Sequence, residues 1–287
     1  MATSGSPGRR LAIEIAAHAA ILVVVAFALY PILWVVSLAL SPGVTPTRRV
    51  IPLPDGLSLE HFAAVVFRAD DDGTWLFGHQ LLSSLLVAAA TAIVAVAIAT
   101  PAAFALSRFD FVGKRAGTEG LLLTQTFPAV AASVPLYLLL DALSLLDTRA
   151  GLVLVYATTA VPFAIFQLRG AFDAIPRDLE EAAMVDGATR FGAFLRVVLP
   201  VARPALAVTA LFSFMSAWNE FILAATFLST ESHYTLPMVL QSYAGEHDAN
   251  LGHFAAGAIV VSIPVMALFY VLQRQLVTGL TSGGVKG

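Results

Sequence analysis

Cysteine is absent from this 287-residue chain, which excludes disulfide-stabilised folds and metal sites with thiolate ligands. Charge is also scarce, because only 12% of the residues are charged, against about 25% in soluble domains. The net charge of −3 leaves no basic excess for binding nucleic acid. The six histidines show no metal-binding spacing such as HExxH. We expect neither a metal ion nor a cofactor in this chain.

A phosphate-binding loop is missing as well. The pattern GxxxxGK[ST] does not occur, and the Gly113-Lys114 pair is followed by Arg115 rather than by Ser or Thr. The chain therefore does not bind ATP through such a loop. Any ATP-driven role requires a separate ATPase subunit that holds ATP and Mg²⁺.

Apolar residues dominate instead, at 58% of the chain with a mean hydropathy of +0.83. A helix needs about 20 mostly apolar residues to span a bilayer. Six segments meet this requirement, at about 15–40, 81–106, 121–143, 151–168, 204–227 and 254–276. We therefore expect an all-α polytopic membrane protein. Arg9 and Arg10 before the first segment would also suit a signal peptide, but its apolar run exceeds the roughly 7–15 residues typical of one.

The positions of the basic residues predict the orientation. Twelve of the 16 Lys and Arg residues lie in the N-terminal tail, after the second and fourth spans, and at the C-terminal end. Lys and Arg concentrate on the cytoplasmic side of membrane proteins, so we expect both termini in the cytoplasm. The expected parts are an N-terminal tail (1–14), a first span (15–40), an external loop (41–78), a five-helix core (79–276) with a cytoplasmic hairpin (173–200) and an outer loop (229–253), and a C-terminal tail (277–287).

The stretch EEAAMVDGATRFGAFLRVVLP, residues 180–200, interrupts the apolar pattern with a cluster of charges. Asp178 and Glu181 have the spacing of a capping box at the start of a helix. Gly187 is expected to end this helix, and Thr189 to cap a second one through FGAFLRVV. The alanines and acids of the predicted hairpin would suit a groove on a partner protein. An ordinary solvated helical loop is the alternative.

The same stretch resembles the EAA motif of ABC-importer permeases, which reads Glu-Ala-Ala, three residues, Gly, nine residues, an aliphatic residue, any residue and Leu-Pro. Val197 takes the aliphatic position, where Ile is usual. The resemblance implies the six-span fold of type I ABC importer permeases, with the hairpin as the coupling helix that docks on the ATP-binding subunit. The implied coupling residues are Glu180, Glu181, Ala182, Ala183, Asp186, Gly187, Leu199 and Pro200.

Four further stretches resemble maltose/maltodextrin permease subunits of the MalG type: AFALSRFDFVGK, FPAVAASVPLYLLLD, SHYTLPMVLQSY and LVTGLTSGGVKG. The resemblance implies a permease of the bacterial inner membrane that imports maltose, maltodextrin or a related α-linked disaccharide such as trehalose. The implied partners are a second permease subunit of the MalF type, two ATP-binding subunits and an extracytoplasmic sugar-binding protein. The implied contact residues are Gly283, Gly284, Val285 and Lys286 for the ATPase, and Tyr234, Gln241, Tyr243 and Gly245 for the binding protein.

Trp218, Asn219 and Glu220 form a polar group within the fifth predicted span. A charge inside a bilayer costs about 2.5–3.5 kcal/mol on insertion scales, so the group is a candidate for the translocation pathway. A polar clamp between helices, or a contact with the partner permease, would also explain it. The alternative function is an ion-coupled secondary transporter with Glu220 as its proton carrier, although the internal repeat typical of such carriers is missing. An intramembrane enzyme is disfavoured, because no span carries a Ser/His pair, paired aspartates or HExxH.

Overall fold

The computed structural model describes residues 7–43, 50–54, 56–245 and 250–284. In this part of the chain the regular structure is helical, and the only β pairing is an isolated bridge between Ala69 and Trp75. The expectation of an all-helical chain is therefore confirmed for the described residues. The chain divides into two compact units: unit 1 comprises Met1–Arg68 and Leu240–Val260, and unit 2 comprises Ala69–Val239 and Val261–Gly287.

Unit 1 is built on one long apolar helix, α1 (Pro7–Leu40), and on shorter segments. These segments are α2 (Glu60–Val66), the end of α12 (Leu236–Tyr243) and the beginning of α13 (Leu251–Gly284). Its small core consists of Ala39, Ala255 and Ala256. The most apolar stretch of α1 is fully exposed, as expected for a helix that contacts lipid or another chain.

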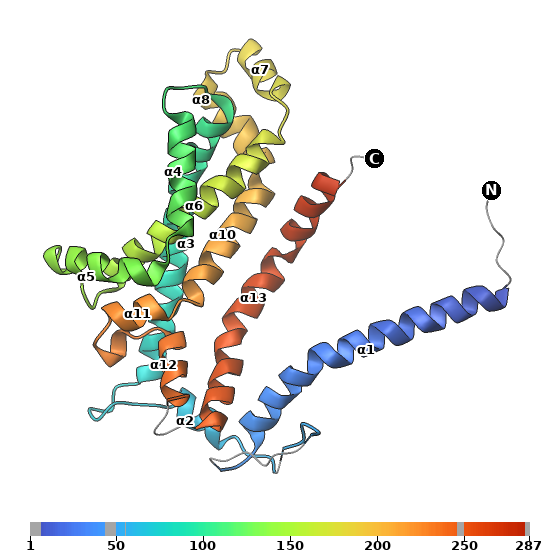
Figure 1. Ribbon diagram of the computed structural model, residues 1–287, viewed down its shortest axis with the longest axis vertical. Helices are drawn as coiled ribbons and strands as arrows, with labels where there is room; N and C mark the ends of the chain where they lie inside the picture. Colours follow the sequence, from blue (N-terminus) through green and yellow to red (C-terminus); the bar gives the residue numbers. More distant parts are fainter. Residues whose placement is uncertain (1–6, 44–49, 55, 246–249, 285–287) are drawn as a thin grey trace. The chain divides into compact units, whose positions relative to one another are not determined.

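Unit 2 holds most of the helices. They are α3 (Leu76–Arg108), α4 (Lys114–Thr126), η1 (Ala129–Ala132), α5 (Ser133–Ala142), α6 (Arg149–Asp173), α7 (Asp178–Val185), α8 (Arg190–Ala193), the π-helical turn η2 (Phe194–Val198), α9 (Leu199–Val201), α10 (Arg203–Trp218), α11 (Ile222–Phe227) and η3 (Glu231–His233). Helices α3, α6 and α10 pack side by side, and α7 and α8 lie at one end of them (Figure 1).

Small residues explain the close packing of α3 against α6. Both helices bury alanines at helical spacing: Ala88, Ala92, Ala95, Ala99 and Ala103 on α3, and Ala157, Ala160 and Ala164 on α6. Small side chains let helix backbones approach closely, which favours association of helices in a membrane. The pair forms the central part of unit 2.

Among the described residues, four helices are long and apolar enough to cross a membrane, namely α1, α3, α6 and α13, and the number rises to six if each of two bent pairs counts as one span. One bent pair joins α4 to α5 with a 95° bend, because Pro128 lacks the amide needed to continue α4. The fifth predicted span is also interrupted, since α10 ends at Trp218 and α11 starts at Ile222. The predicted spans 121–143 and 204–227 are therefore each divided between two helices, and the second bent pair joins Arg190–Val201 to α10.

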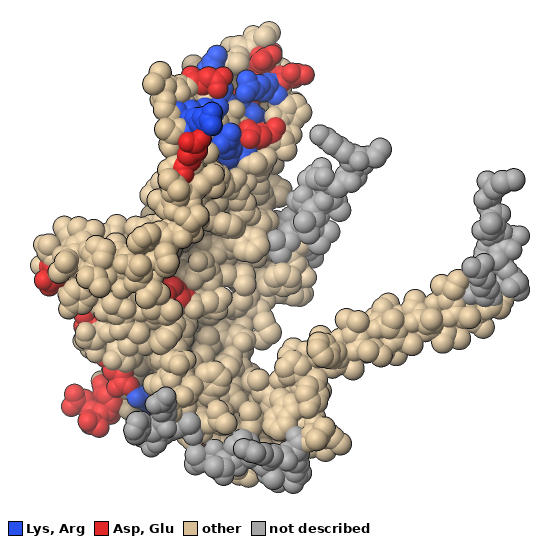
Figure 2. Space-filling model, in the orientation of Figure 1, with Lys and Arg blue, Asp and Glu red and all other residues tan. Residues whose placement is uncertain are grey.

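The charged side chains of unit 2 are distributed unevenly. Lys and Arg gather, together with several Asp and Glu, over α7, α8 and the loop between α3 and α4, whereas the middle of the surface carries few charges and a group of acids lies near its lower end (Figure 2). Charges outside the span and an apolar belt along it are the surface that a bilayer requires. This distribution supports the membrane-protein class inferred from composition.

Candidate functional site

Helix α7 ends in a Schellman motif built on Gly187, whose φ is +90°. The amide of Gly187 donates to the carbonyl of Met184 (3.1 Å). The amide of Ala188 donates to the carbonyl of Ala183 (3.0 Å). These bonds require a left-handed residue after the helix, a conformation that glycine adopts without strain. The predicted role of Gly187 as the end of the first helix is confirmed.

The start of α7 differs from the prediction. Asp178 is the first helical residue, and Arg177 occupies the N-cap position without a side-chain capping bond. The capping box predicted from Asp178 and Glu181 was therefore wrong, because the backbone of Arg177 is already helical and the helix begins one residue too early for it. The acids remain in the first turn, where negative charge interacts favourably with the helix dipole.

The second helix of the hairpin is short and changes type. Thr189 caps it as predicted, since its Oγ1 accepts a hydrogen bond from the amide of Gly192 (3.1 Å). The predicted helix through FGAFLRVV is divided between α8 and the π-helical turn η2, which precedes Pro200. Proline removes an α-helical hydrogen bond, and widened turns relieve such defects. The segment Arg190–Val201 then bends by 73° into α10.

Glu180 is paired inside the chain rather than presented to a partner. Its Oε1 accepts a hydrogen bond from Arg108 Nε (2.5 Å), and the two side chains are only 13% and 7% exposed. Arg108 also donates to the carbonyl of Ile175 (2.9 Å). Nearby, Ser107 Oγ donates to Asp173 Oδ1 (2.5 Å). These contacts fasten the hairpin to the end of α3, and they place Glu180 in a structural position that the sequence did not indicate.

Aromatic residues form the base of the hairpin. The ring of Phe104 lies 4.3 Å from that of Phe194 and 5.9 Å from that of Phe172, measured between centroids. Leu199 packs against this buried cluster, and Pro200 beside it is half-buried. The Leu-Pro end of the motif therefore belongs to the part that holds the hairpin in place, as does Ala183, which is also half-buried.

The outward face of the hairpin is an apolar strip with acids beside it. Leu179, Ala182 and Val185 are exposed, Val185 to 87%. Residues three apart lie on the same face of a helix, so the three side chains form one strip. Glu181 and Asp186 are also exposed. We call this surface, made of these five residues, the hairpin face.

The three polar residues of the fifth predicted span have different surroundings. Trp218 is 2% exposed and stacks on Phe214 at a centroid distance of 5.5 Å. The carboxylate of Glu220 accepts hydrogen bonds from two amides of the first turn of α11 (3.1 and 3.2 Å). Asn219 is the one of the three with an exposed side chain. Glu220 therefore stabilises a helix start, which sequence reasoning missed.

The residues predicted to contact a binding protein lie in both units. In unit 2, Tyr234 is half-buried and donates to the carbonyl of Ser229 (3.2 Å). In unit 1, the ring of Tyr243 lies 5.7 Å from that of His253 and 5.9 Å from the guanidinium of Arg68. The remaining two are an exposed Gln241 and a half-buried Gly245.

The predicted tail contact lies at the end of the last helix. Gly283 and Gly284 are the final residues of α13. Val285 and Lys286 lie outside the described residues.

Comparison with known proteins identifies the family. Residues 95–282, more than half of the chain, match the family described as binding-protein-dependent transport system inner membrane component. The chain is 38% identical over 266 residues to the trehalose transport system permease protein SugB of Mycobacterium tuberculosis, which covers 92% of this chain and 94% of that protein. It is 36% identical over 288 residues to the maltose/maltodextrin transport system permease protein MalG of Yersinia pestis, with coverage of 94% and 92%.

A solved structure agrees with this assignment. The chain is similar, with a TM-score of 0.74 and 26% identity, to a chain in the crystal structure of a bacterial ABC transporter involved in the import of the acidic polysaccharide alginate. The match covers 95% of this chain and 99% of the other. This chain therefore belongs to the family of binding-protein-dependent transport system inner membrane components.

Proposed function

We propose that the chain is the permease subunit of an ATP-driven sugar importer and forms half of its translocation pathway. The observation that carries this proposal is the hairpin face, which is exposed at the basic end of unit 2. An apolar strip beside Glu181 and Asp186 suits a partner groove with an apolar floor and basic residues at its edge. The groove of an ATP-binding subunit is the partner surface that the family membership favours.

The orientation follows from the same charges. Lys and Arg mark the cytoplasmic side, and those of unit 2 gather around the hairpin (Figure 2). The hairpin is therefore on the cytoplasmic side in our proposal. With six spans, two of them bent, both termini of the chain lie in the cytoplasm, and the loop 229–253 lies outside.

The complete importer contains further chains. Two ATP-binding subunits hold ATP and Mg²⁺ and close around the bound ATP, and a second permease subunit of the MalF type completes the pathway. The C-terminal tail, with Gly283, Gly284, Val285 and Lys286, lies between the ATP-binding subunits. An extracytoplasmic sugar-binding protein delivers the sugar to the outer loop, where Tyr234, Gln241, Tyr243 and Gly245 are the contact residues. The permease itself performs no chemical step.

The substrate class is an α-linked disaccharide or maltodextrin. The names of the trehalose and maltose/maltodextrin permeases among the relatives support this class. Asn219 remains the pathway candidate of the polar group, because its side chain is exposed whereas Trp218 is buried. The alternative, an ion-coupled carrier that uses Glu220, is not favoured, since that carboxylate already accepts hydrogen bonds from α11.

A charge reversal on the hairpin face tests the proposal. Glu181→Lys should abolish sugar uptake in cells that express the whole importer, because the new charge repels the basic rim of the partner groove. Membrane abundance should stay normal, since Glu181 is exposed. Glu119→Lys, at an exposed acid of α4 outside the hairpin, is the matched control and should keep uptake. Normal uptake by Glu181→Lys would contradict the proposal.

A further inference from the structure

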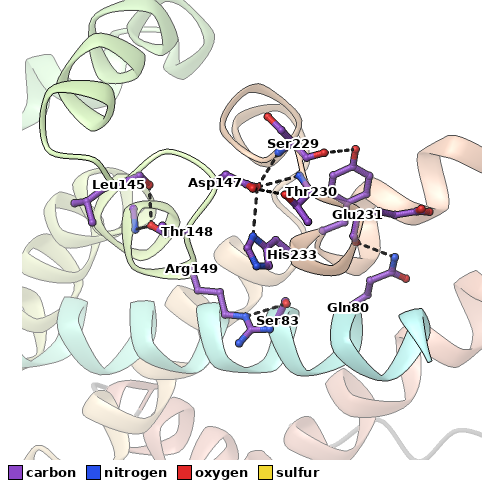
Figure 3. Close-up of polar contacts among 12 residues, drawn as sticks. Gln80, Ser83, Leu145, Asp147, Thr148, Arg149, Ser229, Thr230, Glu231 and His233 are labelled. Atoms are coloured by element: carbon purple, nitrogen blue, oxygen red, sulfur yellow. Dashed lines mark hydrogen bonds and ion pairs between the residues drawn. The ribbon is translucent and has the colours of Figure 1, made fainter. Parts of the chain in front are cut away.

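Asp147 joins the turn before α6 to the first residues after α11. Its Oδ1 accepts hydrogen bonds from the amides of Ser229 (2.9 Å) and Thr230 (3.1 Å) (Figure 3). Its Oδ2 accepts a third from Thr230 Oγ1 (2.5 Å). The amide of Asp147 donates in turn to the carbonyl of Phe227 (2.9 Å). Hydrogen bonds to an ionised carboxylate are about twice as strong as neutral ones, so this contact fixes the segment firmly.

Helix α3 holds the same segment at two more points. Gln80 Nε2 donates to the carbonyl of Glu231 (3.1 Å), as Figure 3 shows. Ser84 Oγ accepts a hydrogen bond from the amide of Leu236 (2.7 Å). Gln80 and Ser84 are both buried, and buried polar side chains are stable only when they are hydrogen-bonded. Residues 229–236 are thus attached to α3 as well as to the turn before α6.

The turn that carries Asp147 is itself rigid. Thr148 Oγ1 accepts a hydrogen bond from the amide of Gly151 (3.0 Å) and caps α6. Arg149 Nε donates to Ser83 Oγ (3.0 Å), which ties the first turn of α6 to α3 (Figure 3). A Cβ atom on Gly151 would lie 2.2 Å from the carbonyl oxygen of Leu145, so glycine is needed for this close approach. The carboxylate of Asp147 is therefore held in a fixed place.

Helix α6 connects this turn to the hairpin. It has 25 residues, which corresponds to about 38 Å at about 1.5 Å per residue. At its far end Asp173 is bonded to Ser107 of α3 (2.5 Å), and the hairpin begins five residues later at Asp178. Because α3 and α6 are joined by polar contacts at both ends, a displacement at one end is carried to the other.

We propose that Asp147 is a positioning residue that fastens residues 229–236 to α6, so that this part of the outer loop and α6 move as one body. In the importer, contact with the sugar-binding protein would then reach the hairpin through α6. The identity of that partner rests on the proposed function, whereas the attachment does not.

Hydrogen exchange measures the attachment directly in the purified full-length chain in lipid nanodiscs. Asp147→Gly removes the carboxylate and tolerates the φ of +54° found at this position. The amides of Ser229 and Thr230 should then exchange about tenfold faster or more, the factor expected when hydrogen bonds to a charged group are lost. Asp147→Asn, which also tolerates this φ, should give a smaller increase and keeps the test valid if the glycine variant does not fold.

Ser144→Gly is the matched control, because Ser144 lies in the same turn with a φ of +55° and is exposed. It introduces the same glycine flexibility but leaves the carboxylate in place, so the two amides should exchange at the wild-type rate. Unchanged exchange in both Asp147 variants, or equally fast exchange in Ser144→Gly, would overturn the proposal.

The coupled movement is tested in the reconstituted importer with ATP-binding subunits and binding protein. The Asp147 variants should keep the basal rate of ATP hydrolysis and lose its stimulation by the sugar-loaded binding protein. Full stimulation despite accelerated exchange would overturn the joint movement. A wild-type importer that shows no stimulation would instead refute the proposed function, and the exchange result would still decide the attachment.

Discussion

Two carboxylates of unit 2, those of Glu180 and Asp147, hold separate parts of the chain together. Glu180 binds Arg108 and fixes the hairpin to α3. Asp147 binds the segment after α11. Burial alone would raise the pKa of Asp147, but the hydrogen bonds donated by the Thr230 hydroxyl and by the amides of Ser229 and Thr230 lower it to about 2. Asp147 therefore acts as a fixed anion in the folded chain.

At this scale Arg108→Gln should destabilise the chain strongly. The substitution leaves Glu180 largely buried without a cation, and breaking such a pair costs about 3 kcal/mol. Arg115→Gln is the control, because Arg115 is 92% exposed in its pair with Glu119 and exposed pairs within one helix contribute about 0.5 kcal/mol or less. Unfolding free energies measured in detergent should show this difference. Equal effects of the two substitutions would contradict it.

The pKa of Asp147 predicts how the attachment depends on pH. Its pKa is lower in the folded chain, at about 2, than its ordinary value of 3.8. Its stabilising contribution is therefore complete above about pH 3.8 and is lost as the pH falls towards 2. A spin label on Ser229→Cys should keep its mobility from pH 8 to pH 5 and become mobile only below pH 3.8. Release already at pH 5 would show that another group controls the attachment.

At the scale of elements, the hairpin combines a short exposed helix with a firmly held base. Gly187 sets the angle between α7 and α8 through its left-handed backbone, and the aromatic cluster around Phe104 fixes where the second helix starts. The exposed strip lies on α7, which Glu180 joins to Arg108 of α3 and Gly187 joins to the part of the hairpin that packs on the buried base. A force on the strip therefore reaches the base with little loss through bending.

Substitution of Gly187 should abolish coupling to the ATP-binding subunits without preventing the spans from folding. Gly187→Pro fixes φ near −65° and removes the amide that bonds to Met184, so uptake should be abolished at normal membrane abundance. Gly187→Ala should have a milder effect, since a left-handed alanine costs about 1–2 kcal/mol. Gly117→Ala on α4, where a Cβ meets no atom within 4 Å, should leave uptake unchanged. Wild-type uptake by Gly187→Pro would exclude a role for this turn.

Local chemistry explains which elements could be predicted from the sequence. Glycine favours a left-handed backbone after a helix, and threonine favours the cap of the next one. The order of helix, turn and second helix therefore follows from the spacing of Gly187 and Thr189. The pairs Arg108–Glu180 and Asp147–Thr230 join residues 72 and 83 positions apart, and no pattern along the chain connects them. The burial of Trp218 likewise depends on its packing against Phe214. The position of a span in the sequence does not predict such a contact.

At the scale of the whole molecule, charge placement and cysteine content together make the topology accessible to experiment. The hairpin end of unit 2 carries most of its basic residues (Figure 2), whereas Asp71 lies in an acidic stretch of the first predicted external loop. Because the chain has no cysteine, a single introduced thiol can be labelled without background. Opposite sides of the membrane can therefore be probed one residue at a time.

Thiol labelling should place these two regions on opposite sides. A membrane-impermeant maleimide should label Asp71→Cys in intact spheroplasts, because this residue is exposed and external in the proposed topology. Val185→Cys, at a position that is 87% exposed, should react only after the membrane is disrupted, in cells that lack the ATP-binding subunits. Labelling of Val185→Cys in intact spheroplasts would reverse the proposed orientation.

The hairpin connects two long helices, and the chain bends by 73° between the Arg190–Val201 segment and α10. Helix α6 enters the hairpin at one end, and α10 leaves it at the other through that sharp angle. A displacement of the hairpin is therefore passed to α6 at one end and to α10 through this bend at the other. We expect the same displacement of the hairpin to reach α6 and α10 in different directions, because the chain turns sharply only after it has left the hairpin towards α10.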